Sequence, residues 1–348
     1  MSKKIVHIGH ACTFMSPFIE LVKSDFDFES HLFYLTLGAT KYKTFPSPNI
    51  KLAKRTFFGR AKYYLGISIK MHQAEKIMLH GLFDYKTIML LFFMPWLLKK
   101  CYWVIWGGDL YCYQLNEKSW GCRVKEFLRK KVIKKIGHLV TYIKGDYKLA
   151  QQWYGAQGQY HECFMYPSNL YQEYTIPDKV HEGINIQVGN SADPSNNHLD
   201  IFKRLEKYHK HNVTIYVPLT YGGDAYADEV IKEGRKIFGD KFIPLTEHVP
   251  FHQYLAFLGS VDIAIFNHKR QQAMGNTITL LGLGKKVYMR SDVTQWDFFK
   301  DHDIVVYDIE NINIYDLDEK ILAENRGKIK NYLSYENYKN QLECIFNQ

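Results

Sequence analysis

The sequence predicts an α/β protein made of two doubly wound, Rossmann-like domains. Strand-like apolar runs alternate with helical patterns in both halves of the chain, as in repeated strand–helix–strand units that build a parallel sheet. The chain has 348 residues, which is long for one compact domain and suits two. Several predicted strands end in small or polar residues, and proteins with parallel sheets bind their ligands at such strand ends.

Composition narrows the class of protein. Hydrophobic residues make up 46% of the chain and charged residues 23%, so a sizeable core is expected. The net charge of +9 favours contact with anions such as nucleic acid, phosphorylated metabolites or an anionic membrane, without selecting one of them. The six cysteines form no CxxC pair, which predicts reduced thiols and neither a zinc site nor a disulfide framework.

In the first half, the apolar pattern predicts a series of strands separated by helices. The strands are expected at residues 4–8, 31–37, 76–79, 102–105, 138–142 and 163–166, and the helices at 14–23, 86–98, 120–136 and 145–153. Pro95 is expected to break the helix that contains it. Residues 40–60 are basic and irregular.

A polar connector is expected at residues 170–182, and the alternation then restarts. The strands of the second half are predicted at 184–188, 213–218, 241–245, 261–266 and 286–289, and the helices at 198–210, 224–238, 251–258, 276–283, 294–300 and 318–346. The second half therefore predicts a second parallel sheet.

Polar clusters at the strand ends of the first half are candidates for catalysis. Asp109 follows Gly107-Gly108 after a strand, where a carboxylate could reach a substrate hydroxyl as a general base. The alternative is a turn or helix-capping Asp after Gly-Gly, which composition alone favours. His10 and His80 also end strands, and their convergence on one edge is a hypothesis to set against two ordinary structural histidines.

In the second half, two segments have the character of phosphate-binding loops. Gly189, Asn190 and Ser191 end a strand, and Gly275, Asn276 and Thr277 stand where a helix begins. Free backbone N–H groups and the helix dipole favour a diphosphate at such a place. The alternative is that both segments only cap helices and turns. Neither GxGxxG nor a P-loop is present.

The basic helix expected at 120–136 and the apolar segment 86–98 suggest a contact with a membrane surface. The alternatives are a solvated basic face and a helix buried against the sheet. The segment is too short to span a bilayer, which needs roughly 18–20 apolar residues.

Five stretches carry a family resemblance: HGLF (80–83), WVIWGGDLY (103–111), VGNSADPSNNH (188–198), VPLTYGGDAYADEV (217–230) and QQAMGNTITLLGLGKKV (271–287). In this order they resemble the 4-acetamido-4,6-dideoxygalactosyltransferases (Fuc4NAc transferases), glycosyltransferase family 56. The resemblance implies a GT-B architecture, in which two Rossmann-like domains face a cleft. Residues 1–169 would form the acceptor-binding domain, 170–330 the donor-binding domain, and 331–348 a helix that crosses back to the first.

The resemblance also implies roles for residues. Asp109 or His10 would be the catalytic base, and His80 and Trp106 would lie on the acceptor side. The donor would contact the following residues: Gly189, Asn190, Ser191, Tyr221, His248, Val249, Gln272, Gly275, Asn276 and Thr277. No metal and no other cofactor are expected. An inverting reaction requires the base, and a retaining one does not.

The activity implied is transfer of a Fuc4NAc-like deoxyamino sugar from a dTDP-sugar, or a UDP-sugar, to a polyprenyl-diphosphate-linked saccharide. Such an enzyme would act in bacterial surface polysaccharide synthesis, bound peripherally to the anionic cytoplasmic face of the inner membrane, with no nucleic-acid partner. Two alternatives stay open at this point. One is a GT-B transferase with another nucleotide sugar, for an O-antigen or lipooligosaccharide branch. The other is a non-catalytic basic protein that binds membranes or nucleic acid.

Overall fold

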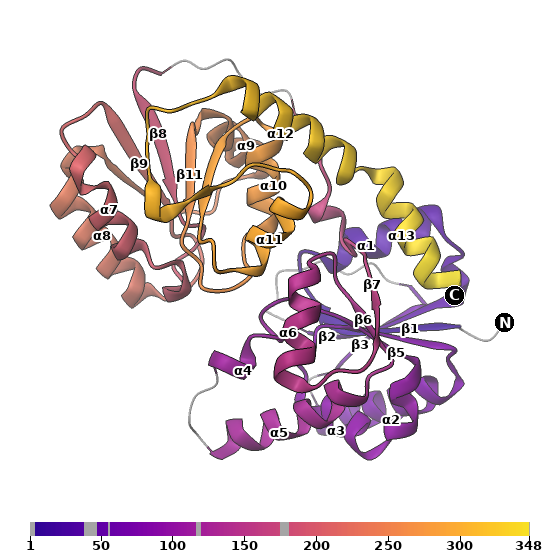
Figure 1. The fold of residues 1–348 in the computed structure, drawn as a ribbon. Coiled ribbons are helices and arrows are strands. Elements are labelled where there is room, and N and C mark those ends of the chain that lie inside the picture. Colours follow the sequence, from indigo (N-terminus) through magenta and orange to yellow (C-terminus); the bar gives the residue numbers. More distant parts are fainter. Residues whose placement is uncertain (1–3, 38–46, 55, 116–119, 175–180, 348) are drawn as a thin grey trace. The chain divides into compact units, whose positions relative to one another are not determined.

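The structure is a computed structural model that describes residues 4–37, 47–54, 56–115, 120–174 and 181–347. The chain divides into two compact units. Unit 1 comprises Met1–Ser168 together with Glu336–Gln348, and unit 2 comprises Asn169–Tyr335. Each unit is an α/β layer structure with one sheet (Figure 1).

Unit 1 contains a seven-stranded parallel sheet in the order β3-β2-β1-β4-β5-β6-β7. Its strands are β1 (Ile5–Ala11), β2 (His31–Leu37), β3 (Ile50–Leu52), β4 (Lys76–His80), β5 (Cys101–Val104), β6 (His138–Val140) and β7 (Gln159–His161). Every residue of β4 and β5 is buried, as expected for central strands that helices cover on both faces. This explains why these strands have almost continuous apolar sequences.

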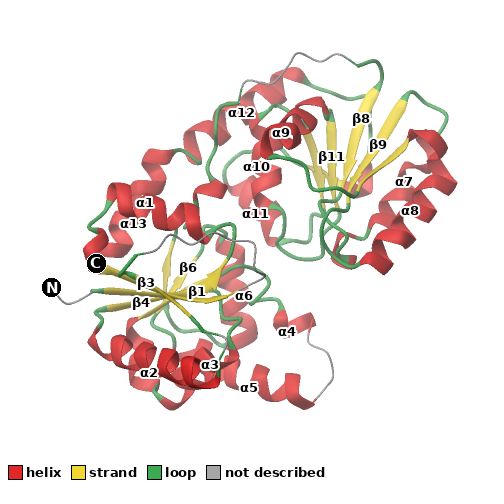
Figure 2. Ribbon diagram, turned by 180° about the vertical axis from the view of Figure 1, so that it is seen from behind, coloured by secondary structure: helices red, strands yellow, loops and turns green. Residues whose placement is uncertain are grey.

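Helices cover both faces of this sheet (Figure 2). The helices are α1 (Met15–Asp25), α2 (Phe57–Gln73), α3 (Tyr85–Phe93), α4 (Cys112–Leu115), α5 (Trp120–Lys135), α6 (Lys144–Tyr154) and α13 (Tyr335–Asn347). In both views α2, α3 and α5 lie on one face, and α1 and α13 lie on the other. Helix α3 ends before Pro95, as predicted, and a short 3-10 turn (Pro95–Lys100) follows it.

Helix α13 is held to unit 1 by hydrogen bonds at several points. The ammonium of Lys76, at the start of β4, donates to the carbonyls of Ile345 and Phe346 at 2.8 Å each. These carbonyls belong to the last turn of the helix, where no intrahelical donor is available. At the other end, the Tyr338 hydroxyl donates to the carbonyl of Met165. The final helix is therefore an integral part of unit 1.

Unit 2 contains a six-stranded parallel sheet in the order β10-β9-β8-β11-β12-β13. Its strands are β8 (Ile184–Val188), β9 (Val213–Pro218), β10 (Phe242–Leu245), β11 (Ile263–Phe266), β12 (Lys286–Met289) and β13 (Tyr307–Asp308). Its helices are α7 (His198–Leu205), α8 (Asp224–Phe238), α9 (Phe251–Ser260), α10 (Met274–Gly282), α11 (Thr294–Asp301) and α12 (Glu319–Tyr332). Figures 1 and 2 show α7 and α8 on one face of the sheet, opposite the others.

Several element predictions were wrong. Residues 163–166 form no strand, because this buried apolar segment turns at Met165, whose φ is 59°. The last strand of unit 1 is β7 instead. Within 40–60, β3 and the start of α2 were missed, because basic residues interrupt the apolar pattern there; 38–46 and 55 lie outside the described residues. The helix expected at 318–346 is two helices, and β13 was not predicted. Of the connector predicted at 170–182, residues 175–180 lie outside the described part of the chain.

The described residues include no helix that is long and apolar enough to cross a bilayer. All six cysteines are free thiols.

Candidate functional site

Each sheet has one point at which the strand order reverses. In unit 1 this point lies between β1 and β4, and in unit 2 it lies between β8 and β11. The loops that follow the two central strands leave in opposite directions there, so a crevice opens at the carboxyl ends of the strands. The two switch points are therefore the candidate ligand-binding sites of the two units.

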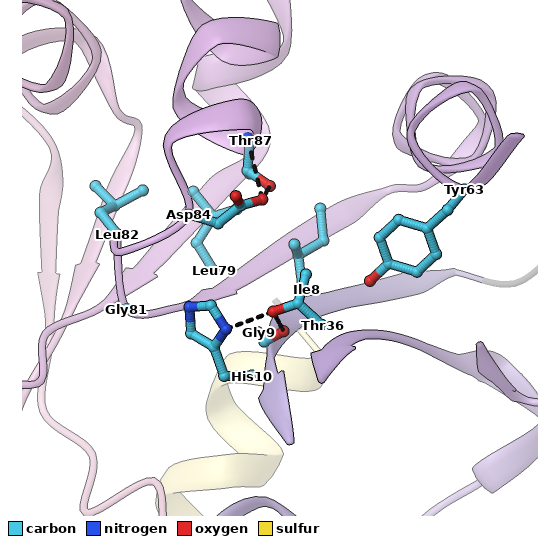
Figure 3. Close-up of a pocket in the computed structure, with 10 residues that line it drawn as sticks. All are labelled: Ile8, Gly9, His10, Thr36, Tyr63, Leu79, Gly81, Leu82, Asp84 and Thr87. Carbon is cyan, nitrogen blue, oxygen red and sulfur yellow. Dashed lines mark hydrogen bonds between the residues drawn. The ribbon is translucent and has the colours of Figure 1, made fainter. Parts of the chain in front are cut away.

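A small pocket opens at the switch point of unit 1 (Figure 3). Its lining residues come from the ends of β1, β2 and β4, from α2 and from the start of α3: Ile8, Gly9, His10, Thr36, Tyr63, Leu79, Gly81, Leu82, Asp84 and Thr87. The imidazole of His10 lies beside Thr36, and its Nδ1 is hydrogen-bonded to the Thr36 hydroxyl. Of the predicted catalytic residues, His10 is the one that lines this pocket.

The contacts of Thr36 favour the tautomer of His10 that carries its proton on Nδ1. The Thr36 hydroxyl donates to the carbonyl of Gly9 at 3.3 Å, so its oxygen is left to accept a hydrogen bond from Nδ1–H of His10. Nε2 then has a free lone pair, and no described residue donates to it. Burial lowers the pKa of His10, while the carboxylate of Asp84 opposes this shift. A neutral imidazole with an unoccupied Nε2 has the properties of a general base at neutral pH.

Asp109, the other predicted base, is fully buried. One carboxylate oxygen accepts from the backbone N–H of Leu82 at 2.9 Å and from the indole N–H of Trp103 at 2.7 Å. The other accepts from the N–H groups of Trp106 and Leu110, each at 3.0 Å. Burial raises the pKa of Asp109, and its hydrogen bonds oppose that shift. Four donors occupy a carboxylate without access to solvent, so these contacts indicate that Asp109 positions the loops after β4 and β5.

His80 and Trp106, the predicted acceptor-side residues, are connected through Tyr166. Trp106 donates its indole N–H to the Tyr166 hydroxyl at 2.8 Å, and this hydroxyl is hydrogen-bonded to Nδ1 of His80 at 2.7 Å. His80 is completely buried, and burial lowers its pKa to about 3. His80 is therefore neutral, and of the pair only Trp106 is accessible at this sheet edge.

In unit 2, the segment after β8 is a turn stabilised by amide side chains. Gly189 has φ 68°, and a Cβ there would lie 2.3 Å from Nε2 of His198, so only glycine fits. The Asn196 side chain accepts from the backbone N–H of Asn190 at 2.9 Å and donates to the Ser191 hydroxyl at 3.2 Å. The structure thus brings Asn190 and Ser191 together through Asn196, a residue that was not predicted to belong to the site.

Gln272 connects this turn with the loop after β11. Its side chain donates to Asn190 Oδ1 at 3.3 Å and accepts from the Ser195 hydroxyl at 2.8 Å. Gln295 donates to the backbone carbonyl of Gln272 at 2.7 Å. Tyr221 is largely exposed, and its hydroxyl interacts with the side chain of Asn190. Asn190, Tyr221 and Gln272, all predicted donor-binding residues, therefore lie in one cluster.

The third predicted segment begins helix α10, although Thr277 lies deeper in it than expected. Ala273, with φ 59°, is the N-cap, so Gly275 and Asn276 lie in the first turn, whose N–H groups have no intrahelical acceptor. The backbone N–H and the hydroxyl of Thr277 both donate to the carbonyl of Ala273. Gly275 and Asn276 can therefore present N–H groups to an anion, whereas the groups of Thr277 are already used by the helix. This removes Thr277 from the predicted donor contacts.

His248 and Val249 lie in an exposed loop before α9. No hydrogen bond among the described residues connects either of them to the cluster around Asn190. Neither do the described residues contain a group of three or more His, Cys, Asp or Glu side chains that could hold a metal ion.

Three residues that shape these sites were missed: Thr36, Tyr166 and Asn196. Thr36 contacts His10, which lies 26 positions away in the sequence, and Tyr166 contacts His80, which lies 86 positions away. No local sequence pattern could therefore reveal either of them. Asn196 is different, because the sequence DPSNN before a helix start is a turn signal that could have identified it.

Comparison with solved structures supports the fold. HepE from Anabaena, in complex with UDP-glucose, matches with a TM-score of 0.69 and 11% identity, over 99% of this chain and 100% of that one. WaaG, a glycosyltransferase involved in lipopolysaccharide biosynthesis, matches with a TM-score of 0.60 and 12% identity over 98% of both chains. Sucrose-phosphate synthase from Thermosynechococcus elongatus matches with a TM-score of 0.65 and 10% identity, over 99% of this chain and 98% of that one. At these identities the likeness shows the fold, and the predicted GT-B class is confirmed.

Family membership comes from the sequence itself. The profile of a family described as 4-alpha-L-fucosyltransferase, glycosyl transferase group 56, matches residues 10–344. The match covers the switch points of both sheets and nearly the whole chain, and it confirms the resemblance found in the motifs. The chain therefore belongs to glycosyltransferase family 56.

Proposed function

We propose that this glycosyltransferase moves a Fuc4NAc-like deoxyamino sugar from a dTDP-linked donor to a lipid-linked saccharide in bacterial surface polysaccharide synthesis. Family membership supports the choice of sugar and of lipid-linked acceptor. The observation that carries the proposal is the cluster of Asn190, Tyr221 and Gln272 beside the free first-turn N–H groups of α10. Amide side chains and free N–H groups suit a nucleotide sugar, which presents hydroxyls and a diphosphate.

In this proposal, unit 2 binds the donor. The N–H groups of Gly275 and Asn276, at the positive end of the α10 dipole, stabilise the negative charge that grows on the departing diphosphate. Gln272 and Asn190 hydrogen-bond to sugar hydroxyls. Because Gln272 is itself held by Gln295 and Ser195, its amide is oriented before the donor arrives.

Unit 1 supplies the base. Nε2 of His10 takes the proton of the acceptor hydroxyl as the oxygen attacks the anomeric carbon, and the bond between that carbon and the diphosphate oxygen breaks to release dTDP. This is an inverting displacement, so the anomeric configuration of the product tests it. The step uses no metal ion, and activity in the presence of EDTA is the corresponding test.

The proposal includes a peripheral site on the anionic cytoplasmic face of the inner membrane. Large apolar side chains are exposed on α2, α3, the turn after α3, and α5: Phe57, Phe58, Leu65, Ile69, Phe93, Trp96, Trp120 and Phe127. Helix α5 adds exposed basic residues, although Arg129 is buried and paired with Glu126 at 2.6 Å. Apolar side chains among cations suit an anionic lipid surface.

Nucleotide binding is the first test. Thermal unfolding of the protein is followed with dTDP, UDP or GDP, and dTDP is expected to raise the melting temperature most. A ligand at 100 times its Kd stabilises a protein by about 2.7 kcal/mol, which is easily detected. A larger shift with UDP would favour the alternative with another nucleotide sugar. No shift with any nucleotide would contradict the transferase proposal.

Membrane binding is tested separately by co-sedimentation with vesicles of phosphatidylglycerol and phosphatidylcholine, or of phosphatidylcholine alone. Binding is expected only with the anionic vesicles, and the double variant Phe57→Ser/Phe58→Ser is expected to weaken it. A steep, salt-dependent affinity for DNA in place of vesicle binding would favour the nucleic-acid-binding alternative.

A further inference from the structure

Four aromatic rings gather at the carboxyl edge of the unit 1 sheet. The Trp106 ring makes edge-to-face contacts with Phe14 at 5.6 Å, with Phe83 at 5.9 Å and with Tyr166 at 5.4 Å between centroids. Phe14 is 41% exposed and Phe83 is 39% exposed, whereas Tyr166 is buried. We call Phe14, Phe83 and Trp106 the aromatic platform. Two of its three rings thus remain open to solvent where a folded domain would be expected to bury them.

The loops that carry the platform are fixed in place. The Asp109 carboxylate accepts hydrogen bonds from the N–H groups of both Leu82 and Trp106, so one buried charge holds the loops of Phe83 and Trp106 together. Gly81, with φ 78°, leaves the space that the Phe83 ring fills, because a Cβ there would lie 2.6 Å from that ring. A rigid aromatic surface loses little entropy when it binds a ligand.

A chain of hydrogen bonds behind the platform orients the Trp106 ring. An indole N–H can only donate, so the Tyr166 oxygen accepts from Trp106, and the same hydroxyl is hydrogen-bonded to Nδ1 of His80. Nε2 of His80 is in turn hydrogen-bonded to Nδ1 of His7 at 3.0 Å, and Nε2 of His7 to Nδ1 of His31 at 2.9 Å. Because the indole N–H is already donated, Trp106 offers a ligand its ring and no donor.

The platform lies next to the proposed base. The His10 ring is 6.2 Å from the Phe83 ring, centroid to centroid. A group that packs on Phe83 and Trp106 would therefore hold its own substituents near Nε2 of His10. The polar side chains of the adjoining pocket include His10, Thr36 and the carboxylate of Asp84, and none of its lining residues is Lys or Arg. Such a lining suits an uncharged sugar better than the diphosphate of a lipid carrier.

We propose that the aromatic platform binds the terminal sugar of the acceptor, with the C–H face of a pyranose ring packed on Phe83 and Trp106 and the reacting hydroxyl directed at His10. This inference rests on the proposed function and adds to it the place and the chemistry of the acceptor site. Pyranose rings have an apolar face of C–H groups, and burying that face against aromatic rings is favourable in water.

Saturation-transfer NMR with methyl glycosides of N-acetylated hexosamines, in the presence of saturating dTDP, tests the proposal. The wild-type protein is expected to transfer magnetisation to the C–H protons of one ring face of the glycoside. Trp106→Ala and Phe83→Ala are expected to lower this signal at least tenfold, and Trp106→Phe to retain a substantial part of it because the ring face remains. Tyr315→Ala, which removes an exposed ring of unit 2, is the matched control and should leave it unchanged.

The outcomes separate this inference from the proposed function. Binding of dTDP, followed by thermal shift, should be equal in all four variants, and an unchanged melting transition without dTDP reports that each variant is folded. If no glycoside binds while dTDP does, or if binding survives both Trp106→Ala and Phe83→Ala, the platform proposal is overturned and the donor site stands. If no nucleotide shifts the melting temperature of the wild type, the proposed function itself fails.

Discussion

The two sheets share a topology, yet their carboxyl edges carry different chemistry. At the switch point of unit 1 the side chains are rings: the imidazole of His10, the aromatic platform, and the chain from Tyr166 to His31 behind it. At the switch point of unit 2 they are mainly amides: Asn190, Asn196 and Gln272. One fold therefore supports two kinds of site, and the difference lies in the residues that follow the strands.

This difference fits a division of labour. Amides donate and accept hydrogen bonds at any pH and can hold a ligand rich in hydroxyls and phosphate oxygens. Rings offer apolar surface, and an imidazole can also take up a proton. We therefore expect substitutions in unit 1 to act on turnover, on acceptor binding and on the pH dependence, and substitutions in unit 2 to act on donor affinity. The following predictions test that contrast, beginning with the largest effect.

Replacement of His10 by Gln removes the proposed base and keeps a polar side chain of similar length. The turnover number is expected to fall by about 10²–10⁴-fold, the usual contribution of a general base, while the Kd for dTDP stays unchanged. In the wild type, kcat/KM should rise with pH through the pKa of His10, which burial places below its ordinary value, and should be level above pH 7. Unchanged turnover in the variant would exclude His10 from proton transfer.

Asp109→Ala is expected to act first on stability, because it leaves four buried N–H donors without their acceptor. The free energy of unfolding of unit 1 should fall by about 3 kcal/mol or more, measured by urea denaturation. Asp193→Ala provides the comparison in unit 2, where this side chain accepts one backbone hydrogen bond from Ser195, and about 1 kcal/mol is expected. A fully stable Asp109→Ala protein that lacks turnover would instead support a catalytic role for this carboxylate.

The buried histidines should make the stability of unit 1 depend on pH. Burial lowers the pKa of His80 to about 3 in the folded state, so below pH 6.5 the unfolded chain binds a proton that the folded chain does not. The contribution of His80 to the free energy of unfolding is therefore fully present above pH 6.5. Below that pH it is lost by about 1.4 kcal/mol for each pH unit. His80→Gln should reduce the slope of unfolding free energy against pH by that amount between pH 6 and 4. An identical slope in both proteins would show that His80 is not neutral in the fold.

Gly275→Val places a branched side chain beside the first-turn N–H groups of α10. The Kd for dTDP should rise by roughly tenfold, which corresponds to about 1.4 kcal/mol, while acceptor binding is unchanged. Gly327→Val is the matched control, because a Cβ at Gly327 in α12 meets nothing within 4 Å. Isothermal titration with dTDP measures the Kd of both variants. Equal affinities in the two variants would move the diphosphate away from α10.

Much of the fold could be predicted from the sequence, because the signals for it are local. The strands 31–37, 213–218 and 286–289 and the helix 224–238 were predicted at the bounds observed, since buried parallel strands and amphipathic helices have strong periodic patterns. Helix α2 was missed because Lys and Arg fall among its apolar residues. Residues 163–166 misled the prediction, because an apolar run that is buried need not be extended.

The candidate site was predictable only in part. The strand-end positions of His10, Asn190 and Gln272 could be read from the sequence, because the topology of parallel sheets brings such positions to one edge. The role of each side chain at that edge could not be predicted from the sequence. Asp109 has the sequence context of a catalytic base, but its contacts with Leu82 and Trp103 depend on how three separate segments pack. The aromatic platform likewise joins residues that lie far apart in the chain.

The attachment of α13 to Lys76 has a consequence for the order of synthesis. The last carbonyls of residues 336–347 accept hydrogen bonds from the Lys76 ammonium. These residues leave the ribosome only after all of unit 2 has been made. Unit 2, which we propose binds the donor, can therefore be complete while the sheet that contains His10 still lacks one of its covering helices. On this view a nascent chain can bind nucleotide before it can transfer sugar.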